Sequence, residues 1–346
     1  MVLYLLPISS AVSFSFPILC LHIISGYNEG QSVNYVANFL HHVMSNGPTT
    51  LLLGCGYTLS AVATMLGSDA AICTTRSDRS AAKLRDLGFA CEVLDVTRGS
   101  GDASKNPASQ LTAILHRYPT IRTIIDGIPP FVDPDDQNVA LQGPRAVLHA
   151  IAALAPREYP IHIVYLSTTG VYGERNGGIV TEHTTPQPRE IHADARRRCE
   201  EMYVANHSSV TVLRVAGIYG PGRSILDRLL SGSYRTVAGT DRFTNRIHVA
   251  DLATAITRIT TRTTSPNELP PIINLCDGEW LRSSELLALC ATYASFPPPP
   301  AIPAELAHHT MLSHQRVDGS LLRATLLPEL QFSGIRKFLD RVSQNS

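Results

Sequence analysis

Residues 50–59 read Thr-Leu-Leu-Leu-Gly-Cys-Gly-Tyr-Thr-Leu, an apolar run followed by two closely spaced glycines and a segment compatible with a helix. A glycine turn in this setting typically connects a strand to a helix whose start accepts a pyrophosphate. The first glycine permits the tight turn, and the second lets a phosphate approach the backbone. We therefore predict a dinucleotide-binding site here, formed by Gly54, Gly56, Tyr57, Thr58 and Leu59.

Leu59 replaces the third glycine of the usual G-x-G-x-x-G pattern, so the helix must pack on its strand in a different way. A structural turn without a ligand therefore stays open as an alternative. A site for S-adenosylmethionine is a further alternative, but such sites usually have one acid two residues before the first glycine and another after the second strand. The chain has Leu52 and the segment 75–77 at these places, without an acid, so this alternative is disfavoured.

The end of the second predicted strand bears on the choice of cofactor. An acid there suits the ribose 2′-hydroxyl of NAD, whereas an arginine suits the 2′-phosphate of NADP because guanidinium pairs with phosphate in a forked geometry. Arg76 and Ser77 occupy this place. We predict NADP as the cofactor, with NAD as the alternative; a solvated loop arginine is a third interpretation. Asp95 ends the third predicted strand, where an acid can bind the adenine amino group or cap the next turn.

Strand-like and helix-like stretches alternate beyond Pro48, which is typical of a parallel α/β sheet. The predicted strands are 50–53, 71–75, 91–96, 123–128, 161–167, 210–215 and 272–275. The predicted helices are 60–66, 80–87, 139–154, 190–205, 224–230, 251–259 and 283–293. The pattern predicts a Rossmann-like, doubly wound parallel sheet at residues 48–217, followed by a smaller C-terminal substrate-binding region at residues 218–346.

Residues 1–25 carry no charge and are apolar, but Pro7, Pro17 and several serines interrupt them. This stretch is too broken for a membrane span, and it lacks the basic start of a signal peptide and the arginines of a transit peptide. We interpret residues 1–47 as a disordered extension, with Met44 as an alternative start, and predict a cytoplasmic protein. A targeting or anchoring role for this segment is the alternative.

The composition narrows the classes of partner. The chain has 346 residues, is 44% hydrophobic and carries 29 basic against 29 acidic residues. A neutral chain lacks the basic surface that is typical of nucleic-acid binding. The seven cysteines show no C-x-x-C pair and no zinc-type spacing with histidine, so we predict no metal site and a reducing compartment. The partner is expected to be a small molecule. The composition does not decide between a monomer and an oligomer.

Residues 165–173, Tyr-Leu-Ser-Thr-Thr-Gly-Val-Tyr-Gly, bring hydroxyl groups to the end of a predicted strand, where such folds bind ligands. Two later segments accompany this one, namely 213–221 and 245–251. In this order, the three segments resemble those of the extended short-chain dehydrogenase/reductases, which include NAD(P)-dependent epimerases, dehydratases and reductases. The resemblance covers about residues 50–303 and implies an NAD(P)-binding Rossmann enzyme.

The resemblance also implies catalytic residues. In the family, a Ser or Thr four residues before the tyrosine of V-Y-G binds the substrate oxygen; here it is Thr168, with Ser167 beside it. The family's Tyr-x-x-x-Lys pair, which moves the proton and holds the ribose, is missing from this sequence. Counting back from Glu200, which resembles the family's helix glutamate, gives His192 and Arg196 at these two positions. Histidine can transfer a proton near neutral pH, whereas arginine can hold ribose hydroxyls but cannot be deprotonated.

A solvated helix face, on which the arginines pair with nearby acids, is the alternative interpretation of this helix. Farther on, Arg223 and Arg246 are candidate anchors for an anionic substrate, His248 is interpreted as structural, and Asp251 is expected to cap a helix. We expect an atypical family member that acts on a small carbonyl, hydroxyl or sugar-nucleotide substrate. The alternative is a non-catalytic NAD(P)-binding sensor or assembly factor.

Overall fold

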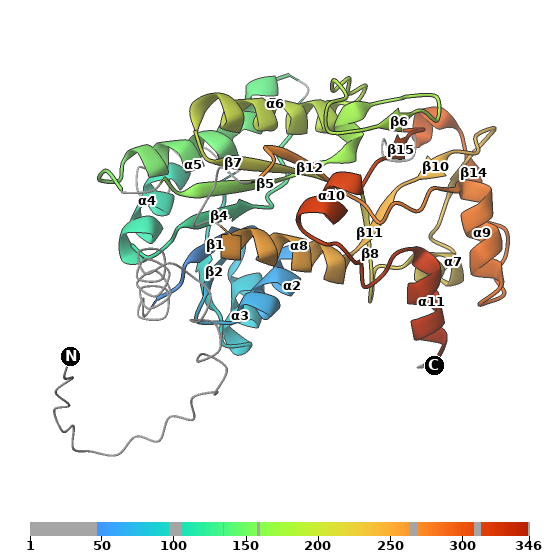
Figure 1. The fold of residues 1–346 in the computed structure, drawn as a ribbon, viewed down its shortest axis with the longest axis horizontal. Helices are drawn as coiled ribbons and strands as arrows, with labels where there is room; N and C mark the ends of the chain where they lie inside the picture. The colour runs from blue at the N-terminus through green and yellow to red at the C-terminus, as the bar shows by residue number, and fades with distance from the viewer. Residues whose placement is uncertain are drawn as a thin grey trace, which may run out of the picture. The chain divides into compact units, whose positions relative to one another are not determined.

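The computed structural model describes residues 47–96, 106–133, 135–157, 160–262, 269–307 and 313–344 of the chain (Figure 1). The predictions made for residues 1–46, including Met44 as a start, lie outside this part. The predicted cofactor, catalytic and substrate residues all fall within it. Every candidate site residue can therefore be placed in the fold.

A central sheet of seven parallel strands organises the described chain, in the order β3-β2-β1-β4-β5-β7-β12. Its strands are β1 (Thr50–Leu53), β2 (Ala71–Thr75), β3 (Ala90–Val93), β4 (Thr123–Asp126), β5 (His162–Thr168), β7 (Val210–Val215) and β12 (Ile272–Leu275). The order reverses at β1, since β2 and β3 lie on one side of it and the later strands on the other. This arrangement confirms the predicted Rossmann-like fold, and its switch point lies where the carboxyl ends of β1 and β4 meet.

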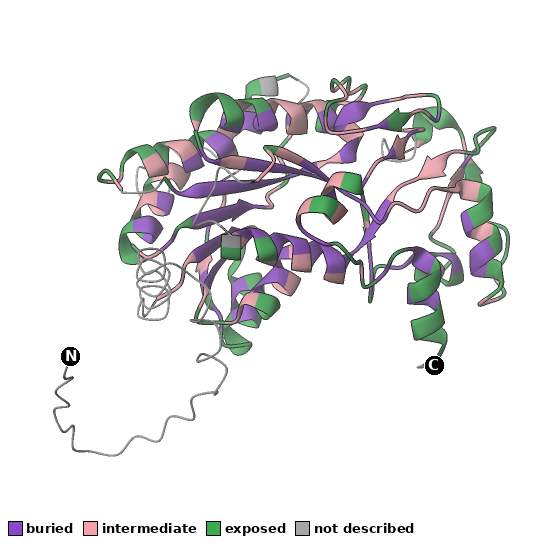
Figure 2. Cartoon of the chain, viewed as in Figure 1, coloured by how far each residue is buried: buried purple, intermediate pink, exposed green. Residues whose placement is uncertain are grey.

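Helices cover both faces of the sheet (Figure 1). One layer contains α4 (Pro107–Arg117), α5 (Gln142–Ala152) and α6 (Ile191–Asn206), and the other contains α2 (Tyr57–Leu66), α3 (Asp78–Asp86), α8 (Val249–Arg262) and α10 (Ser320–Thr325). The sheet lies buried between these layers (Figure 2), and β1 and β2 are buried at every residue. A strand covered on both faces is apolar throughout, which explains the short continuous apolar runs in the sequence.

The chain beyond β7 adds short strand pairs and further helices. The strand pairs are β8 (Gly217–Tyr219) with β11 (Arg246–His248), β9 (Thr236–Val237) with β14 (Ala301–Ile302), β10 (Phe243–Thr244) with β13 (Leu281–Arg282), and β15 (Arg316–Val317) with the earlier β6 (Ile179–Val180). The further helices are α7 (Ile225–Leu230), α9 (Ser283–Ala291), α11 (Ile335–Gln344) and the 3₁₀ turn η7 (Ala304–Leu306). Because β12, α8 and α10 return to the central sheet, the chain beyond Gly217 also contributes to the Rossmann core; the predicted division at this residue stays a prediction.

Several predicted boundaries shift in the structure. The sequence prediction missed α4, although Leu111, Ile114 and Leu115 repeat at helical spacing and are buried. The predicted helix 139–154 divides into a 3₁₀ turn, η4 (Gln137–Leu141), and α5. Helix α2 begins at Tyr57, three residues earlier than predicted, so the glycine turn opens directly onto a helix start.

The prediction for Asp251 is wrong. This residue does not cap α8 but lies in its first turn, because the helix follows β11 directly and begins at Val249. The buried carboxylate of Asp251 accepts hydrogen bonds from the N–H groups of Gln331 and Phe332, at 2.7 and 2.9 Å. Asp251 therefore fixes a C-terminal segment against α8.

Candidate cofactor and substrate site

The two glycines of the turn after β1 have different surroundings. Gly54 has a φ of 80°, and its N–H donates to Thr74 Oγ1 at 3.1 Å. A Cβ at Gly54 would lie 2.8 Å from Ile128 Cγ1, so both conformation and packing require glycine here. A Cβ at Gly56 would meet no atom of the described chain within 4 Å. Only Gly56 therefore leaves open space in which a ligand can approach the backbone.

Helix α2 starts at this open space. Gly56 is its N-cap residue; within the described chain no side chain caps the helix, and no acid stands in its first turn. The first N–H groups of a helix have no partner inside the helix, and the helix dipole gives them a partial positive charge. Tyr57 is exposed and Thr58 is half-buried. The start of α2 is therefore suited to an anionic group such as a phosphate.

Leu59, at the position of the missing third glycine, is buried. Its Cδ1 would lie 2.8 Å from a Cβ at Gly127, the residue that follows β4. In the usual pattern the glycine of this helix–strand contact lies on the helix. In this chain it is Gly127, which lies at the end of the strand. This arrangement lets α2 pack closely on the sheet without the third glycine.

The residues predicted to bind the 2′-phosphate and the adenine of the cofactor lie just beyond β2 and β3. Arg76 follows β2 directly and is exposed. The Ser77 hydroxyl accepts a hydrogen bond from the Ser80 N–H at 3.4 Å and so caps α3. Asp95 is half-buried, two residues beyond the end of β3. Arg76 is thus accessible to a ligand, while Ser77 stabilises the start of a helix.

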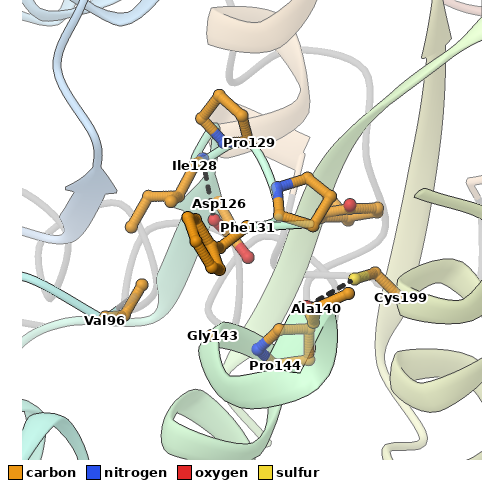
Figure 3. A pocket seen from close by; sticks show the side chains of 11 residues that line it. Val96, Asp126, Ile128, Pro129, Phe131, Ala140, Gly143, Pro144 and Cys199 are labelled. Carbon is orange, nitrogen blue, oxygen red and sulfur yellow. Dashed lines mark hydrogen bonds between the residues drawn. The ribbon is translucent and has the colours of Figure 1, made fainter. Parts of the chain in front are cut away.

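A small cavity lies beside the turn that follows β4 (Figure 3), and Asp126 stands in its wall. The Asp126 carboxylate accepts hydrogen bonds from the Tyr203 hydroxyl at 2.7 Å and from the Ile128 N–H at 3.0 Å. Burial raises the pKa of Asp126, although both hydrogen bonds oppose this shift. Since Ile128 also packs against Gly54, Asp126 indirectly supports the glycine turn. Sequence reasoning missed it; an acid that ends an apolar strand at the switch point was the available signal.

The end of β5 carries a buried polar group made of Ser167, Glu200 and Arg214. The Ser167 hydroxyl donates to Glu200 on α6, and Arg214 Nη2 on β7 lies 2.7 Å from the Glu200 carboxylate. All three side chains are buried. The Arg214 guanidinium also lies 4.9 Å from the centre of the Tyr172 ring. The Ser167 hydroxyl is therefore already engaged inside the protein.

Thr168 differs from its neighbour. It is half-buried, and its Oγ1 accepts a hydrogen bond from the Gly170 N–H at 3.1 Å, at the start of the 3₁₀ turn η5 (Thr169–Tyr172). Because the oxygen is an acceptor in this bond, the hydroxyl hydrogen of Thr168 can still be donated to a ligand. Thr168 thus keeps the capacity that the family resemblance assigns to it.

The three residues at four-residue spacing on α6 have graded burial. His192 is exposed, Arg196 is half-buried, and Glu200 is buried. Arg196 donates a hydrogen bond to the carbonyl oxygen of Leu166, and its guanidinium lies 5.8 Å from the centre of the Tyr165 ring. A Cβ at Gly170 would lie 3.7 Å from the Cβ of Ala193, the neighbour of His192. The first turn of α6 therefore lies beside the turn after β5.

Arg223 lies beside the glycine turn. Its guanidinium is 5.5 Å from the centre of the Tyr57 ring, and the Tyr57 hydroxyl donates to the carbonyl oxygen of Pro221 at 3.0 Å. Burial raises the pKa of Tyr57, although the charge of Arg223 opposes this shift. Arg223 itself is exposed. The structure thus associates Arg223 with the predicted cofactor residues.

Arg246 is buried, unlike Arg223. It donates to the Thr244 hydroxyl, and its Nη2 lies 3.9 Å from a carboxylate oxygen of Glu279. The Asp277 N–H donates to the carbonyl oxygen of Arg246 at 2.7 Å. Among the described residues, the Tyr219 hydroxyl, Arg246 Nε and Asp277 Oδ2 have no hydrogen-bond partner. Burial raises the pKa of Asp277 to about 7, and the charge of Arg246 opposes this shift.

His248 lies in an apolar environment next to this group. Its Nδ1 accepts a hydrogen bond from the Ala250 N–H at 3.1 Å, and its ring centre lies 3.7 Å from that of Phe332. Burial, and then the charge of Arg341, lower the pKa of His248 to about 4. A neutral ring packed on an aromatic side chain agrees with the structural role predicted for it.

The described ranges also bear on metal binding and on membrane crossing. These residues contain no group of three or more His, Cys, Asp or Glu side chains that could hold a metal ion. Among the same residues, no helix has both the length and the apolar character that crossing a membrane requires.

The fold and the open glycine turn define a Rossmann-type α/β protein. Solved structures with the same fold cover most of the chain. A protein of unknown function from Silicibacter pomeroyi is 23% identical, with a TM-score of 0.62, over 86% of this chain and 99% of that one. The UDP-glucose 4-epimerase of Thermus thermophilus is 18% identical, with a TM-score of 0.64, over 84% and 98% of the two chains. The UDP-glucose 4-epimerase of Thermotoga maritima is 14% identical, with a TM-score of 0.64, over 86% and 99%.

Residues 131–276 match the family model described as the NAD dependent epimerase/dehydratase family. This match confirms the resemblance to the extended short-chain dehydrogenase/reductases over that part of the chain. The matched segment contains Thr168, His192, Arg196, Arg223 and Arg246, whereas the glycine turn precedes it. A search of curated proteins found no match.

Proposed function

We propose that this protein binds an NAD-type dinucleotide at the glycine turn and acts on a small carbonyl, hydroxyl or sugar-nucleotide substrate. The space against the backbone at Gly56 is the observation that carries the proposal, because a side chain there would fill the room that a diphosphate needs. The uncapped start of α2 supplies N–H groups for the same anion. The Thermus thermophilus epimerase was solved with NAD and the Thermotoga maritima enzyme with UDP-glucose, which supports this pair of ligands.

The catalytic part of the proposal rests on three residues at the end of β5 and on α6. A bound nicotinamide cofactor would accept or donate a hydride. Thr168 would donate its hydroxyl hydrogen to a substrate oxygen, since its Oγ1 already accepts a backbone hydrogen bond. His192 would take up or release the proton, and Arg196 would bind ribose hydroxyls next to the Leu166 carbonyl group. A His192→Gln variant is expected to lose most of the turnover while its affinity for the cofactor is unchanged.

The substitution Gly56→Ala tests the binding site. The new Cβ meets no described atom, so the free energy of unfolding should change by less than about 1 kcal/mol. The affinity for NAD, measured by titration calorimetry, should fall at least about tenfold because the methyl group takes the place of a phosphate oxygen. A wild-type protein without affinity for NAD or NADP, or a variant with unchanged affinity, would remove the proposed site.

A non-catalytic NAD(P)-binding protein is the second candidate. It is favoured by the engagement of Ser167 with Glu200 and of Arg196 with Leu166, since both side chains have partners inside the protein. The two candidates differ in turnover. If the wild-type protein binds NAD but converts none of a panel of sugar nucleotides and small carbonyl compounds, the second candidate gains.

A further inference from the structure

The segment 220–223, which follows β8, lies against the glycine turn although more than 160 residues separate them in sequence. The Tyr57 hydroxyl donates to the Pro221 carbonyl oxygen at 3.0 Å. A Cβ at Gly220 would lie 2.7 Å from this hydroxyl oxygen, and φ at Gly220 is 154°. The close contact between the two segments therefore depends on the absence of a side chain at Gly220.

The same segment presents Arg223 to the glycine turn. The backbone N–H of Arg223 donates to the Gly220 carbonyl oxygen at 3.0 Å, which closes a tight turn. Its exposed side chain extends over Tyr57, with the guanidinium 5.5 Å from the ring centre. Within the described ranges, no carboxylate forms an ion pair with this guanidinium. The charge of Arg223 is thus held by an aromatic ring and remains available to an anion.

Tyr57 links this charge to the predicted phosphate position. It is the first residue of α2 and follows Gly56, where the backbone is open. A guanidinium offers forked donors that match the oxygens of a diphosphate, and it forms stronger hydrogen bonds with a charged acceptor than with a neutral one. A group bound at the start of α2 would therefore meet backbone N–H groups on one side and Arg223 on the other.

We propose that Arg223, positioned by Tyr57, closes over the diphosphate of the bound dinucleotide from the C-terminal part of the chain. This inference rests on the proposed function and changes the predicted role of Arg223 from a substrate anchor to a cofactor ligand. The contact would also couple cofactor binding to the position of the segment 220–223. Tyr57 acts through Arg223 and is therefore a positioning residue.

Titration calorimetry of the full chain with NAD, ADP and adenosine tests this role. In Arg223→Gln the affinities for NAD and ADP should fall about tenfold, because both ligands contain the diphosphate, while the affinity for adenosine should stay within twofold. Arg228→Gln is the matched control: Arg228 on α7 also lies over a tyrosine ring, 5.2 Å from the centre of Tyr234, and is exposed. Its affinities for all three ligands should be unchanged.

The outcomes separate this inference from the proposed function. Wild-type protein that binds none of the three ligands would overturn both. If Arg223→Gln binds NAD with the affinity of the wild type, the role of Arg223 alone is overturned. The same holds if Arg223→Gln loses as much affinity for adenosine as for NAD. For Tyr57, we expect Tyr57→Phe, which keeps the ring, to retain NAD affinity within threefold, and Tyr57→Ala to lose affinity. If Tyr57→Phe loses as much as Tyr57→Ala, the hydroxyl rather than the ring positions Arg223, and the stacking argument is wrong.

Discussion

The glycine turn after β1 and the end of β5 lie at the same edge of the central sheet. They differ in how far their polar groups are already hydrogen-bonded within the protein. At the turn, the backbone at Gly56 is open and Arg223 is exposed over an aromatic ring. At the end of β5, Ser167 donates to the buried Glu200, and Arg196 donates to a backbone carbonyl group. The first region offers groups to a ligand, whereas the second has mostly paired its groups with one another.

The two regions differ in the kind of atom that each would present to a ligand. In the proposed function, the turn would bind through the N–H groups at the start of α2 and the space at Gly56. The end of β5 would instead act through the side chains of Thr168, His192 and Arg196, and Arg196 already donates to the Leu166 carbonyl oxygen.

The largest expected effect comes from breaking the paired groups at the end of β5. Glu200→Gln leaves the charge of Arg214 buried without compensation, since Arg214 Nη2 lies 2.7 Å from the Glu200 carboxylate in a buried site. We expect the free energy of unfolding to fall by about 3–5 kcal/mol, measured by urea denaturation.

Glu201→Gln is the control for this experiment. Glu201 is the next residue on α6, its side chain is 61% exposed, and its ion pair with Arg197 is at the surface. Such a pair contributes about 0.3–0.5 kcal/mol. Equal losses in the two variants would show that the Glu200 group does not differ from a surface pair, and the contrast between the two regions would fail.

An intermediate effect is expected at the end of β12, where a buried acid has an oxygen without a partner among the described residues. Burial raises the pKa of Asp277 to about 7 from 3.8, so the folded chain holds this proton more tightly than the unfolded chain. The resulting stabilisation is present below pH 4 and is lost as the pH rises to 7. Asp277→Asn should therefore be more stable than the wild type at pH 8 by about 1–3 kcal/mol, and the advantage should shrink towards pH 4. If the variant is instead less stable at pH 8, Arg246 compensates the carboxylate.

The smallest expected effect concerns the choice of cofactor at the open region. Arg76 is exposed just beyond β2, where it can pair with a 2′-phosphate. Arg76→Gln should weaken NADP binding about fivefold, as titration calorimetry would measure, and leave NAD binding unchanged. Arg122→Gln, an exposed arginine next to β4, is a control that should leave both affinities unaltered. A wild-type protein that binds NAD and NADP equally well would contradict the predicted preference for NADP.

Much of the fold could be predicted from local sequence. Short apolar runs bounded by turn residues are enough to identify buried parallel strands, and β7 and β12 have the predicted bounds. Helix α4 lay outside the prediction, although Leu111, Ile114 and Leu115 give it a helical spacing of apolar residues. The glycine turn was readable because a positive φ and a helix start depend on residues that are neighbours in the chain.

The partners of the polar side chains could not be predicted. The sequence places Ser167, Glu200 and Arg214 on separate elements, and nothing local indicates that they pair. The sequence by itself determined the doubly wound sheet and the glycine turn, because both follow from the spacing of apolar residues and glycines within short segments and from the order of those segments. Only the tertiary structure decided that Gly127 accommodates Leu59, that Asp251 binds a C-terminal segment and that Arg223 lies over Tyr57. These contacts join residues far apart in the chain, and the packing of whole elements sets them.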